Sequence, residues 1–383
     1  MKVWYYAFPL QGRRRRPARS AGAIGSVLHH TEPVRRATPT QICKICKRSS
    51  MYIGEQLSDL SDRKLTWAAQ LGVEHIAVQT LHGIEREDGT WDVQAIKNLQ
   101  KRLASFGITM DVLTLNMQSQ YMTRHRFPGI MRGLPSRDAE IEIIKQNIRA
   151  AAEAGVPCLK YNLNLLGVPR TGRTIGRGGA RYSHFDYSKW TDHSLTEAGP
   201  MPAEKMWEII TYFLERVVPV AEECGVRLAC HPHDPPVPHD KGLRGIHRVL
   251  GSIEGLKRFL AITPSKYHGL NFCQGTLAEM CEHPATEVLE AIRYFGSQGK
   301  IFMVHFRNIK GGFLNFEEVY PDNGDVDMYQ AMKVYKEVGY QGMFCPDHVP
   351  QSDVDPDGER QHSFCLGYIR ALIQAVNAEG SQA

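Results

Sequence analysis

Residues 223–236 read ECGVRLACHPHDPP, and the order of residue types in this stretch decides the fold. An amphipathic run ends at Gly225, and glycine is the residue that most often follows the last turn of a helix. The apolar run VRLAC that comes next has the length and composition of a buried strand. His231 and three prolines follow within a few residues. The stretch therefore predicts a helix, a strand, and a loop that carries polar groups on a backbone stiffened by proline.

The same order of helix, glycine and strand recurs along the chain. Glycine closes an apolar-periodic run in 70-QLG, 105-SFG, 153-EAG, 223-ECG and 337-EVG. Eight strand-like runs alternate with helical patterns: 51-MYIGEQ, 74-EHIAVQT, 108-ITMDVLTLN, 156-VPCLKYNLNLL, 226-VRLACHP, 268-HGLNFCQG, 300-KIFMVHFRN and 341-QGMFCPDH. This repetition predicts an α/β protein, a (β/α)8 TIM barrel over residues 51–383. A doubly wound sheet is disfavoured because no glycine-rich loop joins a strand to a closely following helix.

The first 50 residues differ in composition from the rest of the chain. They contain GRRRRPAR at 12–19, and they hold 11 of the 46 lysines and arginines but one of the 41 acidic residues. We interpret residues 1–50 as a disordered basic tail, either an over-long start or a targeting arm. Residues 51–383 then carry 35 basic against 40 acidic side chains, so the formal charge of +5 does not indicate nucleic-acid binding.

Composition also indicates a soluble, cytoplasmic protein with no membrane partner. No apolar run approaches the roughly 18 residues that a membrane-spanning helix needs. Most of the nine cysteines lie within apolar strand or helix patterns, which favours reduced core thiols over a disulfide framework. The motif 43-CKIC-46 has no second pair, so a zinc or redox role is disfavoured. The oligomeric state stays open, a homo-oligomer included.

Metal-capable side chains end four consecutive predicted strands. These residues are His231, Cys273, His305 and Asp347, each about one βα unit after the previous one. Alone, each has an ordinary structural interpretation, such as a core thiol or a turn-capping carboxylate. Because the carboxyl ends of barrel strands meet at one rim, we expect the four to converge on a shared divalent metal.

The types of donor atom narrow the range of metals that the site could bind and indicate its role. Two imidazoles, a thiolate and a carboxylate favour Fe(II), Mn(II), Co(II) or Zn(II) over Mg(II) or Ca(II). Structural zinc sites more often use closely spaced cysteine pairs, whereas ligands from separated strands leave positions open for substrate. We therefore predict a catalytic metal. The prolines that follow His231 would hold its imidazole in place, and Asp234 is a candidate to orient a neighbouring group, although an Asx turn explains it equally well.

A long insertion follows the fourth predicted strand. It covers about 167–201 and contains VPRTGRTIGRGGARYSHFDYSKW. Long loops at the carboxyl face of a barrel more often line a site than serve as slack. We expect this one to line a site, with structural slack as the alternative.

These motifs together resemble the mannonate dehydratase family. The runs that carry the resemblance are HPHDPP, GLNFCQGTLAE, VHFRNIKGGFLNFEEVY and PDH, in that order, with KYNLNLL and RYSHFDYSKW before them, over roughly residues 51–377. The resemblance implies a xylose-isomerase-like TIM barrel that holds Mn(II) or Fe(II). The family's ligands correspond to His231, Cys273, His305 and Asp347.

The resemblance also implies a reaction, the dehydration of D-mannonate to 2-keto-3-deoxy-D-gluconate. A base must remove the C2 proton and an acid must protonate the departing C3 hydroxyl. His348, which follows Asp347, matches the family's catalytic histidine, although a rim histidine is the plain alternative. A sugar-acid carboxylate would bind a forked cation, for which Arg307, Arg170 and Arg173 are candidates. Asn162 and Asn308 are candidates to bind its hydroxyls.

The chain departs from the family pattern at several positions. His233 replaces the first aspartate of HPDDPP, and Cys345 and Val349 replace the arginine before PDH and the glycine after it. A tyrosine expected after PDH has no clear counterpart unless Tyr368 serves. Because the ligands are kept and these neighbours change, we expect retained metal chemistry with an altered aldonate specificity.

Three other functions stay open at this level. A metal-dependent sugar isomerase or epimerase of the same barrel type is the main alternative, and Cys273 counts against it. A binding protein with an inactive site would be expected to lack a ligand, and none is missing. A nucleic-acid enzyme of the endonuclease IV barrel type would be expected to have a basic surface, whereas the body is net acidic.

Overall fold

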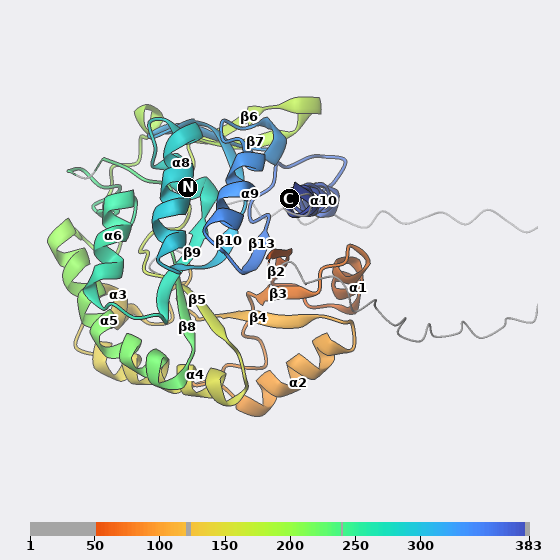
Figure 1. The fold of residues 1–383 in the computed structure, drawn as a ribbon. Helices are drawn as coiled ribbons and strands as arrows, with labels where there is room; N and C mark the ends of the chain where they lie inside the picture. The colour runs from red at the N-terminus through yellow and green to blue at the C-terminus, as the bar shows by residue number, and fades with distance from the viewer. Residues whose placement is uncertain (1–50, 120–123, 239, 380–383) are drawn as a thin grey trace, which may run out of the picture. The chain divides into compact units, whose positions relative to one another are not determined.

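The computed structural model describes residues 51–119, 124–238 and 240–379 (Figure 1). The segment 1–50, with the CKIC motif at 43–46, lies outside the described residues, as do 380–383. The predictions made for the tail therefore remain predictions.

A parallel sheet closes around the centre of the described part. Over the described residues its order is β1-β13-β10-β9-β8-β5-β4-β3-β2. The strands are β1 (Met51–Ile53), β2 (Glu55–Leu57), β3 (His75–Val78), β4 (Thr109–Thr114), β5 (Cys158–Asn162), β8 (Arg227–His231), β9 (His268–Cys273), β10 (Ile301–His305) and β13 (Gly342–Cys345). Each matches one of the eight predicted runs, the first of which forms both β1 and β2. The predicted TIM barrel is confirmed.

The first barrel strand is interrupted at Gly54, between β1 and β2. β1 pairs with β13, and β2 pairs with β3, so the interrupted strand joins the two ends of the sheet. A Cβ at Gly54 would lie 2.1 Å from Sδ of Met343 and 2.9 Å from the carbonyl oxygen of His75. Glycine therefore allows the strand to pass close to its neighbours at the closing point.

Helices cover the outside of the barrel (Figure 1). They are α1 (Asp62–Gln70), α2 (Val93–Ala104), α3 (Pro128–Arg132), α4 (Arg137–Glu153), α5 (Ala203–Cys224), α6 (Ile253–Ile262), α7 (Gln274–Glu279), α8 (Pro284–Ser297), α9 (Met328–Glu337) and α10 (Glu359–Glu379), with single 3-10 turns at Arg177–Gly179, Tyr187–Lys189 and Pro321–Asn323. The five glycines predicted to end helices all have positive φ, between 69° and 77°. Only glycine adopts this conformation without steric cost, which explains the repeated signal.

The apolar residues divide into an interior and an outer layer. The barrel interior holds Ala77, Val112, Cys158, Ala229, Phe302, Met303, Met343 and Cys345. The larger cluster lies between strands and helices and includes the fully buried Leu65, Phe213 and Phe259. The seven cysteines in the described ranges are unpaired, as predicted. No helix in the described part is both long and apolar enough to cross a membrane.

A second, antiparallel sheet was not predicted. Its order over the described residues is β11-β12-β7-β6, with β6 (Gly172–Ile175), β7 (Arg181–Asp186), β11 (Asn308–Gly312) and β12 (Asn315–Val319). The predicted insertion supplies β6 and β7, and the chain after β10 supplies the other two. β12 pairs with β7, and Phe316 packs on Phe185 with 5.7 Å between ring centroids. Segments far apart in sequence thus build a cover beside the carboxyl end of the barrel.

Candidate metal centre

The four predicted ligands lie together. One donor atom from each of His231, Cys273, His305 and Asp347 lies within 4.8 Å of the others. Nδ1 of His305 is 3.2 Å from Oδ1 of Asp347, and Sγ of Cys273 is 3.7 Å from Oδ2 of the same carboxylate. Cys273 and His305 are opposite each other in the β9–β10 register, so the aligned strand ends bring their side chains to one level of the barrel.

The histidine rings have the orientation that a metal site needs. Nδ1 of His231 lies 2.7 Å from the carbonyl oxygen of Pro232, so it carries the proton and leaves the Nε2 lone pair available. Nδ2 of Asn271 lies 3.1 Å from Nε2 of His305, while Nδ1 of that ring faces Oδ1 of Asp347 at 3.2 Å without the alignment of a hydrogen bond. His305 can therefore ligate through Nδ1 when Asn271 presents its amide oxygen to the ring.

The protonation states of the four candidate ligands also suit the binding of a divalent cation. Burial raises the pKa of Cys273 to about 12 and lowers the pKa of His305 to about 4. Burial would raise the pKa of Asp347, but His305 and His348 beside it hold that pKa well below its usual range. Asp347 has φ of 68°, a strained backbone for a non-glycine residue. Neutral imidazoles, a carboxylate and a thiol that a cation would deprotonate make up a suitable ligand set.

Arg307 holds the carboxylates around the cluster. It is 3% exposed, and its Nε donates to Oδ2 of Asp347 at 3.2 Å. One terminal nitrogen donates to Asp234 at 2.9 Å, and the other lies 2.9 Å from Glu279. A Cβ at Gly275 would lie 2.4 Å from this guanidinium, which explains the glycine of the CQG motif.

Arg170 has its guanidinium fully committed as well. Its N–H groups donate to both carboxylate oxygens of Asp234, to Glu318 and to the carbonyl oxygen of Pro169. Arg170 and Arg307 share three carboxylates, because a guanidinium nitrogen of each lies within 3.9 Å of Asp234, Glu279 and Glu318. Burial raises the pKa of Glu279 to about 8, and the negative charge of Asp234 adds to this effect. The positive charges of Arg307 and Arg170 lower that pKa, but by less than burial and Asp234 raise it.

A buried lysine, which sequence reasoning did not select, lies beneath the cluster. Lys160 is 7% exposed, and its Nζ donates to Oε1 of Gln56 at 2.6 Å. Nε2 of Gln56 in turn donates to Oδ1 of Asp347 at 3.1 Å. Burial lowers the pKa of Lys160. The inward alternation of Cys158, Lys160 and Asn162 on β5 was the available signal.

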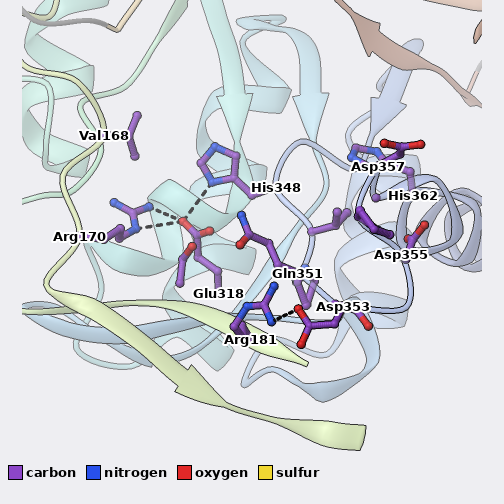
Figure 2. Close-up of a pocket in the computed structure, with 16 residues that line it drawn as sticks. Val168, Arg170, Arg181, Glu318, His348, Gln351, Asp353, Asp355, Asp357 and His362 are labelled. Atoms are coloured by element: carbon purple, nitrogen blue, oxygen red, sulfur yellow. Dashed lines mark hydrogen bonds and ion pairs between the residues drawn. The ribbon is translucent and has the colours of Figure 1, made fainter. Parts of the chain in front are cut away.

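A cavity of about 670 Å³ lies next to the cluster, at the carboxyl end of β13. Its lining comes from the insertion, from β12, from the segment after Asp347 and from α10. The insertion therefore forms one wall of this cavity. Arg170 and His348 approach Glu318 from different sides in Figure 2. Nδ1 of His348 is 3.0 Å from Glu318, and its Nε2 is 4.0 Å from Oδ2 of Asp347.

His348 lies between the candidate ligands and the cavity. Its side chain is 37% exposed and lines the cavity. Burial alone would lower the pKa of His348, but Asp347 and Glu318 outweigh it and raise that pKa to about 9. A cation bound by Asp347 would remove part of this effect and so favour the neutral imidazole, the form that can accept a proton.

The other predicted substrate residues lie in different surroundings. Asn162 is beside His231 in the β5–β8 register and donates to Oγ of Ser119 at 2.9 Å. The amide of Asn308 is buried and bonds the backbone of Pro321 and Val326. Neither residue lines the cavity.

Arg173 and Tyr368 also lie outside the cavity lining. Arg173 is exposed on β6, opposite Ser183. Tyr368 packs on the outer core from α10, with its ring 6.3 Å from that of Phe364. The structure thus brings neither side chain to the candidate centre.

Of the three residues that replace family residues, one lines the cavity. Val349 does so. His233 is fully buried, with Nε2 2.8 Å from the carbonyl oxygen of Leu163 and Nδ1 accepting from the backbone of Leu250. Cys345 faces the barrel interior, where Sγ donates to the carbonyl oxygen of Val304. Neither residue lines the cavity, and backbone groups already bond their polar atoms, so an altered aldonate specificity stays a prediction.

Comparisons with known proteins agree with this geometry. A family model described as D-mannonate dehydratase (UxuA) matches residues 191–381. The mannonate dehydratase of Thermotoga petrophila is 31% identical over 295 residues, 67% of this chain and 78% of that protein. Mannonate dehydratase 2 of Halalkalibacterium halodurans is 30% identical over 322 residues, 76% of this chain and 89% of that protein.

Solved structures share the fold. The mannonate dehydratase of Streptococcus suis serotype 2 superposes with a TM-score of 0.73 at 24% identity, covering 86% of this chain and 96% of that one. An L-ribulose 3-epimerase superposes with a TM-score of 0.52 at 15% identity, covering 86% of this chain and 97% of that one. The barrel is therefore of the xylose-isomerase-like kind.

Proposed function

Since this chain belongs to the mannonate dehydratase family, a family of hydro-lyases, we propose that it is a metal-dependent dehydratase of D-mannonate or a closely related aldonate. The observation that carries the proposal is the convergence of His231, Cys273, His305 and Asp347 beside a cavity that His348 lines. Mn(II) or Fe(II) suits this mixed donor set.

The reaction removes the elements of water from C2 and C3. The C2 proton lies beside a carboxylate and is weakly acidic, and a divalent cation at the four ligands supplies charge stabilisation as that proton leaves. We assign His348 the transfer of the C2 proton, since its Nδ1 is held by Glu318 and its Nε2 side adjoins Asp347. The electron pair of the C2–H bond forms a C2–C3 double bond as the C3–O bond breaks. The resulting enol tautomerises to the 2-keto-3-deoxy acid.

Arg307 and Arg170 position other side chains of the site. Arg307 and Arg170 have their donors committed to Asp234, Glu318, Glu279 and Asp347. We therefore propose that they hold the carboxylates of the site rather than grip the substrate. Asp234 receives both guanidiniums and serves as the link between them. The unpaired thiols support a reducing compartment, and we propose the cytoplasm.

Turnover of D-mannonate tests the proposal. Protein loaded with Mn(II) or Fe(II) under anaerobic conditions is expected to convert D-mannonate, or another aldonate of a small panel, to a 2-keto-3-deoxy acid. Removal of the metal with a chelator is expected to abolish the activity, and Mn(II) to restore it. Formation of an isomer or epimer without loss of water would instead support the isomerase alternative. Inactivity of the metal-replete protein across the panel would reject the dehydratase.

Cys273→Ser is expected to weaken metal binding by at least about 100-fold, because even residues behind the ligands cost 10–100-fold when changed. The serine hydroxyl is a poor ligand for Mn(II) or Fe(II) compared with a thiolate. Metal content after dialysis and Mn(II) titration measure the effect. Cys281→Ser is the matched control, since Cys281 is also buried but donates to the carbonyl oxygen of Leu277 away from the cluster. Full metal occupancy in the Cys273 variant would remove it from the ligand set.

A further inference from the structure

His362, on the first turn of α10, shares the cavity with His348. Both residues line it, and Figure 2 draws them around the same space. The side chain of His362 is 23% exposed. The reaction needs a second proton-transfer group beside His348, and neither the metal ligands nor the arginines provide one.

The orientation of His362 parallels that of His348. Nδ1 of His362 lies 3.0 Å from Oε2 of Glu55, whose side chain is 2% exposed. Nδ1 of His348 lies 3.0 Å from Glu318, which is also buried. In each pair a buried glutamate holds one ring nitrogen and leaves Nε2 for another partner. No residue in the described ranges bonds Nε2 of His362.

The ring of His362 lies beside Gly358, in the segment between His348 and α10. A Cβ at Gly358 would lie 3.7 Å from Cδ2 of His362 and 4.0 Å from Cγ2 of Val349. Cδ2 neighbours Nε2 in the imidazole ring, so this edge of the ring lies close to Gly358, which Val349 also approaches. Gly358 and Val349 both line the cavity.

The chemistry of the lining favours His362 over its neighbours. Arginine keeps its proton, and carboxylic acids are ordinarily ionised near neutral pH. Histidine is the lining residue type suited to hold a proton at neutral pH and release it. Burial would lower the pKa of His362, but the charge of Glu55 outweighs it and raises that pKa. A protonated imidazole at rest has the state that a general acid requires.

We propose that His362 is the general acid that protonates the departing C3 hydroxyl, with His348 serving the C2 proton. This assignment rests on the proposed dehydration. His348 adjoins Asp347 and the ligand cluster, so we place it at C2, the carbon beside the substrate carboxylate. His362 then lies at C3, the next carbon. The C3 oxygen leaves with the electron pair of its bond, takes the proton from Nε2 of His362 and departs as water. The neutral imidazole regains its proton from solvent.

The test compares two substrates that differ in the group leaving from C3. His362→Asn keeps an amide donor for Glu55 but has no proton to release. With D-mannonate this variant is expected to lose about 10²- to 10⁴-fold in turnover, the usual contribution of a general acid. With 3-deoxy-3-fluoro-D-mannonate, fluoride leaves without protonation, so turnover is expected to stay within about fivefold of the wild type. Keto-acid formation and fluoride release are the two readouts.

Two further variants complete the design. Glu55→Gln leaves the imidazole in place and is expected to show the same selectivity with a smaller loss, so it serves if His362→Asn does not fold. His184→Asn, a histidine on β7 that bonds Asn315 outside the cavity lining, is expected to leave both substrates unaffected.

The outcomes separate this assignment from the function it rests on. Equal losses on both substrates, or no loss on either, in an active wild-type background would overturn the role of His362 alone. A metal-replete wild type that yields neither keto acid nor fluoride would reject the dehydratase, and the role of His362 with it.

Discussion

His348→Asn is expected to lower turnover by about 10²- to 10⁴-fold, the range typical of a lost acid or base. Asparagine retains an amide that can donate to Glu318, so the surrounding ion pairs should persist. The proton-carrying Nε2 is lost. Metal content and thermal unfolding are expected to match the wild type, because the four ligands are untouched.

The comparison with His184→Asn separates chemistry from general perturbation. His184 is a partly exposed histidine whose ring bonds Asn315, remote from the ligand set, so its substitution should change neither turnover nor metal content. Unchanged turnover in the His348 variant would reject its role in proton transfer. Loss of metal together with activity would place His348 among the residues that build the metal site instead.

Arg307→Met is expected to lower the free energy of unfolding by about 3–5 kcal/mol, the cost typical of removing one partner from a buried ion pair. Methionine approximates the aliphatic part of the side chain but leaves Asp234, Glu279 and Asp347 without their shared cation. These groups are buried or nearly so, and water does not replace the lost donors. Urea denaturation of the two proteins measures the difference.

An exposed pair provides the reference for Arg307. Arg293 and Glu337 lie 3.2 Å apart with about half of each side chain exposed (49% and 57%). Arg293→Met is therefore expected to cost at most about 1 kcal/mol. Similar small losses in both variants would contradict the view that Arg307 compensates the buried carboxylates.

The barrel and the four candidate ligands were predictable from local signals. Each helix end at Gly225 and its equivalents depends on a backbone conformation that one residue type adopts without cost. Each strand end is marked where an apolar run stops, as at His231 and His305. Parallel strands of similar length then place their carboxyl ends at one rim whatever the packing details. For this reason the fold and the four candidate ligands could be predicted from the sequence.

The second sheet could not be predicted from the sequence in the same way. β7 and β12 pair across more than one hundred residues, and neither has a turn signal that joins it to the other. Strand pairing over such a distance depends on which surfaces meet after the barrel closes. Sequence reasoning therefore predicted that the insertion lines a site, but it did not predict the two strands that the insertion forms.

By itself, the sequence determined the eight-unit barrel and the set of side chains that meet at its rim, because periodicity, helix termination and strand ends are properties of short segments. Only the tertiary structure decided how those side chains are used. Arg170 and Arg307 were plausible substrate clamps until the fold supplied buried carboxylates for their donors. Nothing in the sequence was a reason to select His362, because its partner Glu55 lies 307 positions earlier and only the fold brings the two together. A polar group's role depends on its partner, and partners distant in sequence are chosen by packing.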